Sequence, residues 1–116
     1  MEKIEKPWGY YINLHGDDNN GYKVKILHVN PKSRLSSQSH KHRDEHWVVT
    51  KGIANIEHNG YKYTLKKNDH YFIPKETIHR LQNNSETEHV EVVETQYGNY
   101  LGEDDITRYE DDYNRN

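Results

Sequence analysis

The 116-residue chain contains no cysteine, so it forms neither disulfide bonds nor thiolate metal sites. It also lacks any run of about 18 apolar residues, the length that a membrane-spanning helix needs. No apolar segment near the N-terminus has the features of a signal peptide. These absences predict a cytoplasmic protein that does not enter a membrane, in a compartment that can be reducing.

The sequence also lacks an excess of positive charge. Lysine and arginine together number 16 against 19 acidic residues, which gives a formal net charge of -3. A protein that binds the phosphate backbone of a nucleic acid needs a basic stripe, and none is present. Nucleic acid is therefore excluded as a partner.

Hydrophobic residues are scarce, at 31% of the chain, and charged residues make up 30%. A uniform mixture of this kind would be disordered. Here the apolar residues form short periodic runs, and ten tyrosines and two tryptophans can supply a core. The length fits one domain.

No stretch has a long helical period, whereas many short stretches alternate between apolar and polar residues. The expected strands are residues 8–14, 22–29, 45–50, 53–58, 61–65, 70–74, 78–82 and 89–95, with residues 34–42 as an extended arm. Asn59-Gly60 is a strong signal for a tight hairpin. A helical turn is expected only after residue 103. The pattern predicts an all-β antiparallel sandwich or small barrel.

Histidine and glutamate are concentrated in one short segment before the strand at residues 45–50. His40, His42, Glu45 and His46 lie close together there, and His79 lies on a later expected strand. Neutral imidazole nitrogens and carboxylate oxygens ligate divalent metals such as Zn, Mn, Fe or Ni. Alternate side chains in an extended strand share a face, so His40 and His42 are expected to point the same way. A solvated polar turn is the alternative interpretation.

The carboxylate position of such a site has two candidates. If the strand runs straight from the first histidine, His46 shares the face of His40 and His42. If instead the register of the following apolar strand determines the face that each side chain takes, Glu45 points into the barrel and His46 points away. We favour the second register. The predicted metal ligands are therefore His40, His42, Glu45 and His79.

Two segments resemble the two sequence motifs of the cupin superfamily. The first motif, His-x-His followed by a glutamate and later a glycine, is matched by His40, His42, Glu45 and Gly52. The second motif is matched by Asn68, Pro74, Glu76, His79 and Asn83, with both of its glycines replaced. The loop before the glutamate is one residue shorter than usual. The resemblance implies a double-stranded β-helix (jelly-roll) barrel, a single domain over residues 1–116.

Other segments resemble the C-terminal cupin domain of type II phosphomannose isomerases. They are Lys6-Pro7-Trp8-Gly9, Arg34-Leu35-Ser36, Tyr71-Phe72-Ile73-Pro74, His79-Arg80-Leu81 and the acidic end from Gly98 to Tyr113. In that family a mannose-1-phosphate guanylyltransferase domain usually precedes the cupin. The sequence contains no such domain and no Gly-rich pyrophosphorylase signature. We therefore expect a free-standing cupin without guanylyltransferase activity.

The resemblance implies interconversion of mannose 6-phosphate and fructose 6-phosphate through a cis-enediol. A divalent metal, zinc first and Mn, Fe, Ni or Co as alternatives, would act as Lewis acid. A general base would move the proton between C1 and C2, and the candidates are His46, Glu76 and a metal-bound water. Glu76 replaces a motif glycine and is expected at the pocket mouth. The expected catalytic residues are His46, Glu76 and Arg80.

The dianionic phosphate of such a substrate needs cationic partners. Arg34, Arg43 and Arg80 lie beside the motif positions, and Arg80 and Arg34 are the first candidates. Ser36 and Gln38 have the same parity as the first motif histidine and are expected to contact sugar hydroxyls. The remaining interpretation of each arginine is a solvated surface charge.

Two other classes of function stay open at this point. One is a cupin that binds a sugar phosphate or nucleotide sugar without turnover, and the other is a different metal-dependent cupin enzyme, such as a dioxygenase or an epimerase. The acidic tail at roughly residues 98–116 contains interleaved tyrosines and is expected to pack on the barrel or on a second subunit. The resemblance implies a homodimer.

Overall fold

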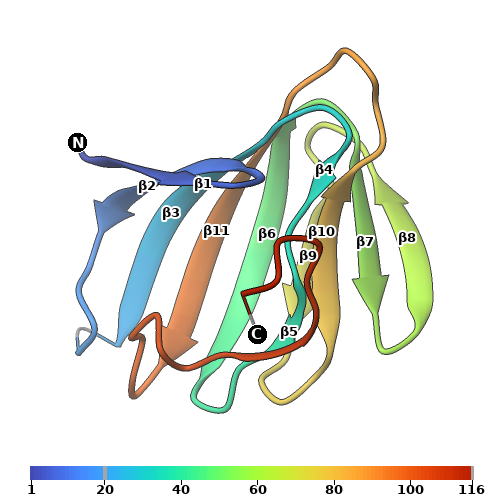
Figure 1. Ribbon diagram of the computed structural model, residues 1–116. Helices are drawn as coiled ribbons and strands as arrows, with labels where there is room; N and C mark the ends of the chain where they lie inside the picture. The colour runs from blue at the N-terminus through green and yellow to red at the C-terminus, as the bar shows by residue number, and fades with distance from the viewer. Residues whose placement is uncertain (20, 116) are drawn as a thin grey trace.

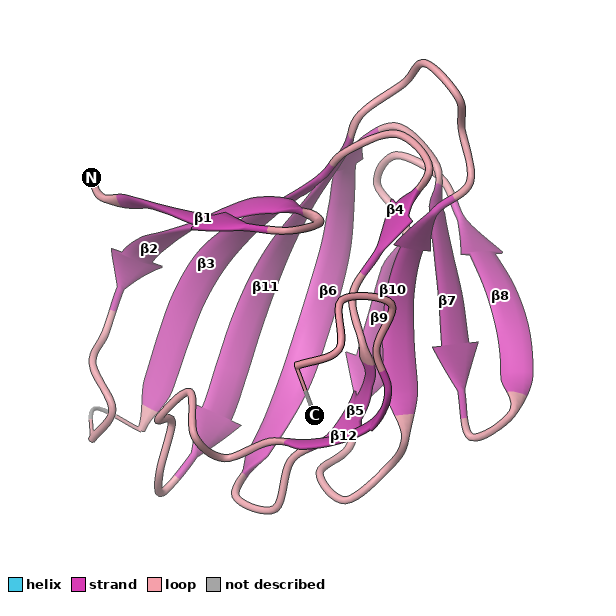
Figure 2. Ribbon diagram, viewed as in Figure 1, coloured by secondary structure: helices cyan, strands magenta, loops and turns pink. Residues whose placement is uncertain are grey.

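The computed structural model describes residues 1–19 and 21–115, and its regular elements are all β-strands in two antiparallel sheets (Figure 2). The first sheet has the order β1-β2-β3-β11-β6-β9, formed by Lys3–Lys6, Gly9–His15, Tyr22–Val29, Val90–Gly98, Arg43–Lys51 and His70–Ile73. The second has the order β12-β5-β10-β7-β8, formed by Thr107–Glu110, Ser37–Ser39, His79–Asn83, Ala54–His58 and Tyr61–Leu65. A short strand, β4 (Ser33–Arg34), also pairs with β10. Within the described ranges no helix is long and apolar enough to cross a membrane.

The predicted hairpin is present between β7 and β8. Asn59 and Gly60 form its two-residue loop, with φ angles of 51° and 85°. Positive φ at both central positions is the requirement of a type I′ turn, whose twist matches that of paired strands. The Asn-Gly pair therefore fixes the register of these two strands.

Three expectations about the elements differ from the structure. The extended arm at residues 34–42 is divided into β4 and β5. The segment after residue 103 forms strand β12 instead of a helical turn, because the edge of β5 offers it backbone hydrogen-bonding partners. The N-terminal strand β1 was not expected, since Lys3–Lys6 has too many charged residues to give an apolar alternation.

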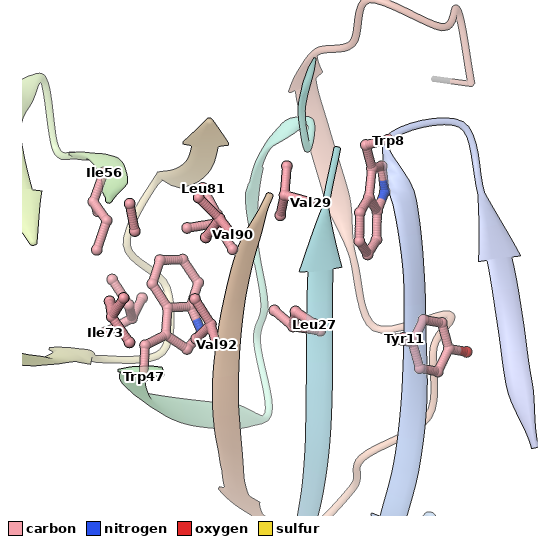
Figure 3. Packing of buried hydrophobic residues seen from close by; sticks show 12 residues of the cluster. Trp8, Tyr11, Leu27, Val29, Trp47, Ile56, Ile73, Leu81, Val90 and Val92 are labelled. Carbon is pink, nitrogen blue, oxygen red and sulfur yellow. The ribbon is translucent and has the colours of Figure 1, made fainter. Parts of the chain in front are cut away.

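The hydrophobic core lies between the two sheets (Figure 3). Its buried members are Trp8, Tyr11, Leu27, Val29, Trp47, Val49, Ala54, Ile56, Ile73, Leu81, Val90 and Val92. Trp47 of β6 is 2% exposed and is the largest of the fully buried side chains. Burial of apolar area contributes roughly 25 cal/mol per Å², so the aromatic members dominate a core with few aliphatic residues.

The inward faces of the three central strands change from apolar to polar along their length. The apolar half contains Leu27 and Val29 of β3, Trp47 and Val49 of β6, and Val90 and Val92 of β11. The polar half contains Lys23 and Lys25 of β3, Arg43 and Glu45 of β6, and Glu94 and Gln96 of β11. Buried polar groups are unfavourable unless they are paired or bind a ligand. A functional site is therefore expected in the polar half.

The segment after β11 packs back on the barrel. Figure 1 shows it in red, crossing from the end of β11 to β5, with which β12 pairs. The buried Arg80 of β10 donates hydrogen bonds to the backbone oxygen of Leu35 (2.9 Å) and to the carboxylate (2.7 Å) and backbone oxygen (3.0 Å) of Glu110. Arg34 of β4 forms a bidentate pair with Asp112, at 2.7 and 2.8 Å. Two arginines thus fasten the tail to the barrel.

Replacing Arg80 with methionine is expected to lower the free energy of unfolding by about 2 kcal/mol, because a buried cation with three hydrogen bonds is lost. The expected loss is below that of a fully buried pair, since the Glu110 side chain is 65% exposed and regains water. Urea denaturation measures the change, and limited proteolysis reports release of the tail. Arg34→Met, at a half-exposed pair, is the control and should lose less than about 1 kcal/mol. Equal stability of Arg80→Met and wild type would contradict this anchoring role.

Candidate functional site

Three side chains from different strands meet in the polar half of the barrel. They are His40, which follows β5, Glu45 of β6 and His79 of β10. Nε2 of His40 lies 3.3 Å from Oε2 of Glu45, and Nε2 of His79 lies 3.6 Å from Oε1. All three residues are at most 3% exposed. Two imidazoles and one carboxylate form a donor set suited to a borderline divalent metal.

The hydrogen bonds behind the two imidazoles fix their orientation. Nδ1 of His40 lies 2.6 Å from the backbone oxygen of Asp105, and Nδ1 of His79 lies 3.0 Å from that of Thr77. A carbonyl oxygen only accepts, so in each ring Nδ1 carries the hydrogen and donates it. In the neutral imidazole, Nε2 then carries no hydrogen. Its lone pair, which is the one that ligates a metal ion, is directed at Glu45. Metal-ligating histidines are commonly held by this kind of contact, so the residues fit a metal ion.

Arg43 is buried and contacts two of the three residues of the cluster. Its Nε donates to Oε2 of Glu45 at 2.9 Å, and its Nη2 donates to Nε2 of His40 at 3.3 Å. The guanidinium thus supplies the positive charge that this carboxylate requires when buried. A metal ion on the same donor atoms requires Arg43 to give up both contacts.

The structure does not bring His42 to this cluster. Its side chain is exposed, and its ring meets the edge of Tyr100, with ring centroids 6.1 Å apart. The carboxylate of Asp105 accepts hydrogen bonds from the backbone nitrogens of Lys41 and His42, each 2.9 Å long, and holds a bend there. The expected common face of His40 and His42 assumed a straight strand. Because the chain bends, Arg43 turns inward in place of His42.

Glu45 and His46 point in opposite directions, as the preferred register predicted. Glu45 is 2% exposed, whereas His46 is exposed on the outer face of β6, with its ring centroid 4.7 Å from that of Phe72. Glu76 is exposed as well and has a φ of 67°. Its left-handed backbone is the conformation that glycine adopts most easily, which explains why the cupin motif has a glycine at this position. Neither His46 nor Glu76 reaches the buried cluster.

The charges around Glu45 determine its ionisation. Burial raises the pKa of the Glu45 carboxyl, but Arg43, His79 and His40 outweigh it and hold this pKa well below its ordinary value. Burial lowers the pKa of His40. Burial also opposes the charged form of His79, yet its contact with Glu45 leaves the pKa raised. The cluster therefore contains an ionised carboxylate between two histidines of different basicity.

A pocket opens beside Glu45 and His79, with about 590 Å³ of empty volume including its mouth. Its lining includes the polar interior residues Lys25, Arg43, Glu94 and Gln96, the expected sugar-contacting residues Ser36 and Gln38, and, from the terminal segments, Lys6, Glu103, Arg108 and Arg115. Arg34 and Arg80, the two arginines favoured by the sequence as phosphate ligands, do not line it. They hold the tail instead.

Sequence reasoning missed Glu94, a buried carboxyl of β11 in this pocket. Its Oε2 accepts a hydrogen bond from Nε1 of Trp47 at 2.9 Å, and its Oε1 accepts one from Nε2 of Gln96 at 2.7 Å. Burial and the nearby charge of Glu45 raise the pKa of Glu94 to about 7, against the opposing effects of Arg43 and Lys25. The available signal was Glu94-x-Gln96, two polar residues on the face that continues from Val90 and Val92.

Three buried polar atoms in this pocket have no hydrogen-bond partner in the described part of the chain. They are Nη1 of Arg43, Oε1 of Gln96 and Nε of Arg108. Buried polar atoms are nearly always paired in folded proteins, so three orphans around one pocket indicate a place for a polar ligand. The two guanidinium nitrogens donate hydrogen bonds and the amide oxygen of Gln96 accepts them. Together they match a ligand that has both negative charge and hydroxyl groups.

Replacing Glu94 with glutamine is expected to change how stability depends on pH. The native pKa of about 7 lies above the ordinary 4.5, so the native state holds this proton more tightly than the unfolded state. Wild type therefore loses stability as pH rises from 4.5 towards 7, by on the order of 2 kcal/mol, and Glu94→Gln does not. Urea unfolding at pH 5 to 8 measures the difference. Parallel profiles for the two proteins would contradict the raised pKa, and Glu91→Gln on the same strand controls for loss of charge.

Solved structures with a similar fold include cupin proteins. A cupin 2 domain-containing protein from Halorhodospira halophila matches with a TM-score of 0.73 over 91% of this chain and 78% of its own, at 13% identity. A protein from Planctomyces limnophilus matches with a TM-score of 0.73 over 91% and 88%, at 22% identity. At these identities the likeness shows the fold alone. The described residues therefore form one domain with the cupin fold and a candidate metal site.

Its family is shown by sequence. The chain belongs to the family described as mannose-6-phosphate isomerase C-terminal, which matches residues 1–111 and confirms the resemblance seen in the motifs. The alginate biosynthesis protein AlgA of Pseudomonas aeruginosa is 41% identical over 113 residues, which are 97% of this chain and 23% of the relative. A mannose-1-phosphate guanylyltransferase of Salmonella muenchen is 41% identical over 108 residues, 93% of this chain and 22% of the relative. The chain spans less than a quarter of the length of these relatives.

Proposed function

We propose that this protein is a metal-dependent aldose-ketose isomerase that interconverts mannose 6-phosphate and fructose 6-phosphate. The observation that carries the proposal is a His-Glu-His donor set, of which Glu45 and His79 line the pocket, together with a second buried carboxyl in that pocket, Glu94, with a pKa of about 7. Isomerisation through an enediol requires a Lewis acid near the sugar oxygens and a base near C1 and C2. Membership of the mannose-6-phosphate isomerase C-terminal family supports the choice of substrate.

The metal would be held by His40, Glu45 and His79. When bound, a divalent ion supplies Lewis-acid polarisation of the carbonyl and hydroxyl oxygens at C1 and C2 of the sugar. The zinc, manganese, iron, nickel or cobalt that the sequence suggested all accept imidazole and carboxylate ligands. The carbonyl oxygens behind the two imidazoles keep Nε2 directed at the site.

Glu94 is the proposed general base. A base with a pKa near the working pH is efficient because it both accepts and returns a proton. Hydrogen bonds from Trp47 and Gln96 fix its carboxyl group, so little reorganisation is needed when the proton moves. Glu94 takes the proton from C2 of the open-chain aldose and returns it to C1 of the enediol, while the hydroxyl proton passes from O2 to O1, and the reverse reaction uses the same group.

Arg43 and Gln96 would orient the sugar beside this base. Nη1 of Arg43 and Oε1 of Gln96 are buried and have no hydrogen-bond partner among the described residues, so the first can donate to a sugar oxygen and the second can accept from a sugar hydroxyl. Ser36 and Gln38 line the same pocket and offer further polar groups to the hydroxyls. The side chains thus provide a polar wall around the carbons that react.

A second function, anion binding without turnover, is favoured by one observation. Arg43 already contacts both His40 and Glu45, so the cluster is electrostatically balanced without a metal ion. A protein that kept these contacts permanently would bind a sugar phosphate without a Lewis acid. The two functions therefore differ in whether Arg43 leaves the cluster.

A coupled assay with mannose 6-phosphate and a panel of Zn, Mn, Fe, Ni and Co tests the proposal. The expected result is formation of fructose 6-phosphate with at least one of these metals and its loss after chelation. Binding of mannose 6-phosphate without product under every metal would favour the non-catalytic function. Oxygen uptake with iron would instead indicate a dioxygenase.

A further inference from the structure

Two cations of the pocket have no carboxylate partner within the described residues. Arg108 of β12 and Lys6 of β1 form no ion pair there. The other cations of the pocket are committed: Lys25 to Glu103 at 2.6 Å, Arg43 to Glu45 at 2.9 Å and Arg115 to Asp111 at 2.9 Å. Unpaired cations beside a buried polar pocket are available to an anionic ligand.

Arg108 is the stronger of the two candidates. It lies opposite Gln38 of β5 in the sheet, and both residues line the pocket. Its Nε is buried and has no hydrogen-bond acceptor in the described part of the chain. Desolvating a guanidinium nitrogen without an acceptor is unfavourable, so this atom points to a ligand oxygen.

Lys6 enters the pocket from the opposite terminus of the chain. Its Nζ lies 5.7 Å from the centre of the Tyr11 ring, which is a weak interaction that leaves the ammonium hydrogens free. Lys6 and Arg108 are both half-buried, whereas Glu45, His79 and Glu94 are buried. The unpaired cations therefore line the more exposed part of the pocket, and the cluster lines the deeper part.

We propose that Arg108 and Lys6 form the subsite for a phosphomonoester dianion, which is the 6-phosphate of the sugar if the proposed function holds. In a hexose 6-phosphate the reacting carbons C1 and C2 and the phosphate are at opposite ends of the molecule. The pocket offers two matching groups of side chains, with Glu45, His79 and Glu94 in its buried part and the unpaired cations in its half-buried part. A guanidinium suits phosphate because it donates two parallel hydrogen bonds.

Arg34 and Arg80, which hold the tail against the barrel, then have an indirect role in binding phosphate. Arg80 binds Glu110, which lies on the same strand as Arg108. Arg34 binds Asp112 just beyond the strand. Both residues fasten the segment that carries Arg108 and neither contacts the phosphate, so replacing Arg34 should weaken phosphate binding less than replacing Arg108.

Calorimetric titration of wild type, Arg108→Met, Arg108→Lys and Lys6→Met with mannose 6-phosphate, mannose and inorganic phosphate tests the subsite. Arg108→Met should weaken binding of mannose 6-phosphate by about 10- to 100-fold, because hydrogen bonds to a charged group are lost, and should leave mannose unaffected. Arg108→Lys should restore part of the loss, and Lys6→Met should have a smaller effect in the same direction. Lys3→Met, at an exposed position of the same strand as Lys6, is the control for charge. Arg34→Met is the control for loosening of the tail.

The possible results separate this inference from the proposed function. If wild type binds mannose 6-phosphate and Arg108→Met binds it equally well, the subsite is wrong and the isomerase proposal stands. If wild type binds inorganic phosphate through Arg108 but does not convert mannose 6-phosphate, the subsite stands and the isomerase proposal fails. If Arg34→Met loses as much affinity as Arg108→Met, tail order is the cause and the subsite is overturned.

Discussion

Replacing Glu45 with alanine is expected to reduce bound divalent metal from about one ion per chain to less than about a tenth of that. Glu45 is the only carboxylate of the His40–Glu45–His79 donor set, and it lies between the two imidazoles. Without it, two neutral histidines remain beside the cationic Arg43, which repels a metal ion. Elemental analysis of protein that has been loaded with metal and desalted measures the change.

The controls for this prediction come from the same segment. His42→Ala and His46→Ala remove exposed imidazoles and should leave the metal content unchanged. Glu45→Gln keeps the volume and an acceptor for Arg43, which guards against unfolding of the alanine variant. Metal retained in both Glu45 variants and lost in His42→Ala and His46→Ala would contradict the assignment and favour the alternative set, in which His46 takes the place of Glu45.

Replacing Glu94 with glutamine is expected to lower kcat for mannose 6-phosphate by about 10²- to 10⁴-fold, the usual contribution of a general base. Glutamine preserves the shape of the side chain and an acceptor for Trp47 but cannot take up the proton. The KM and the metal content should change little, because Glu94 belongs to neither the donor set nor the phosphate subsite. Steady-state kinetics of the metal-loaded protein measure the effect.

Glu91→Gln is the matched control, since Glu91 lies on the same strand but outside the pocket. It should retain wild-type kinetics. A Glu94→Gln variant with an unchanged kcat would show that another group moves the proton. A variant with an unchanged kcat and a raised KM would assign Glu94 to substrate binding.

The strands and the hairpin could be predicted because their signals are local. Alternating side chains and the Asn59-Gly60 turn are sufficient to place β7 and β8. The inward direction of Glu45 followed from the same alternation, because one buried face fixes the register of a strand. His79 could be linked to this site only through its spacing in the cupin motif, since a contact between strands is not local.

The remaining features depend on contacts between distant segments. His42 turns outward because Asp105, far away in the sequence, holds the bend at residues 41 and 42. The tail becomes a strand because β5 offers it an edge, which its own composition does not reveal. Lys25 is buried because Glu103 pairs with it at 2.6 Å, so its polar side chain occupies an inward position that alternation assigns to apolar residues.

The roles of the arginines also depend on contacts between segments that are distant in the sequence. Arg34 and Arg80 stand next to motif residues, and this position made them the first candidates for phosphate. Their acidic partners come from residues 110 and 112 of the tail, and only the folded structure brings them together. Arg108, which has no acidic partner in the described chain, lies in the tail itself.

The central claim is that this pocket moves a proton between C1 and C2 of a sugar phosphate. Incubation of the metal-loaded protein with fructose 6-phosphate in deuterium oxide, followed by NMR of the sugar, tests it most directly. The claim predicts conversion to mannose 6-phosphate with deuterium at C1 or C2, and loss of both in Glu94→Gln. A metal-loaded protein that binds fructose 6-phosphate but yields neither deuterated sugar nor mannose 6-phosphate would contradict it.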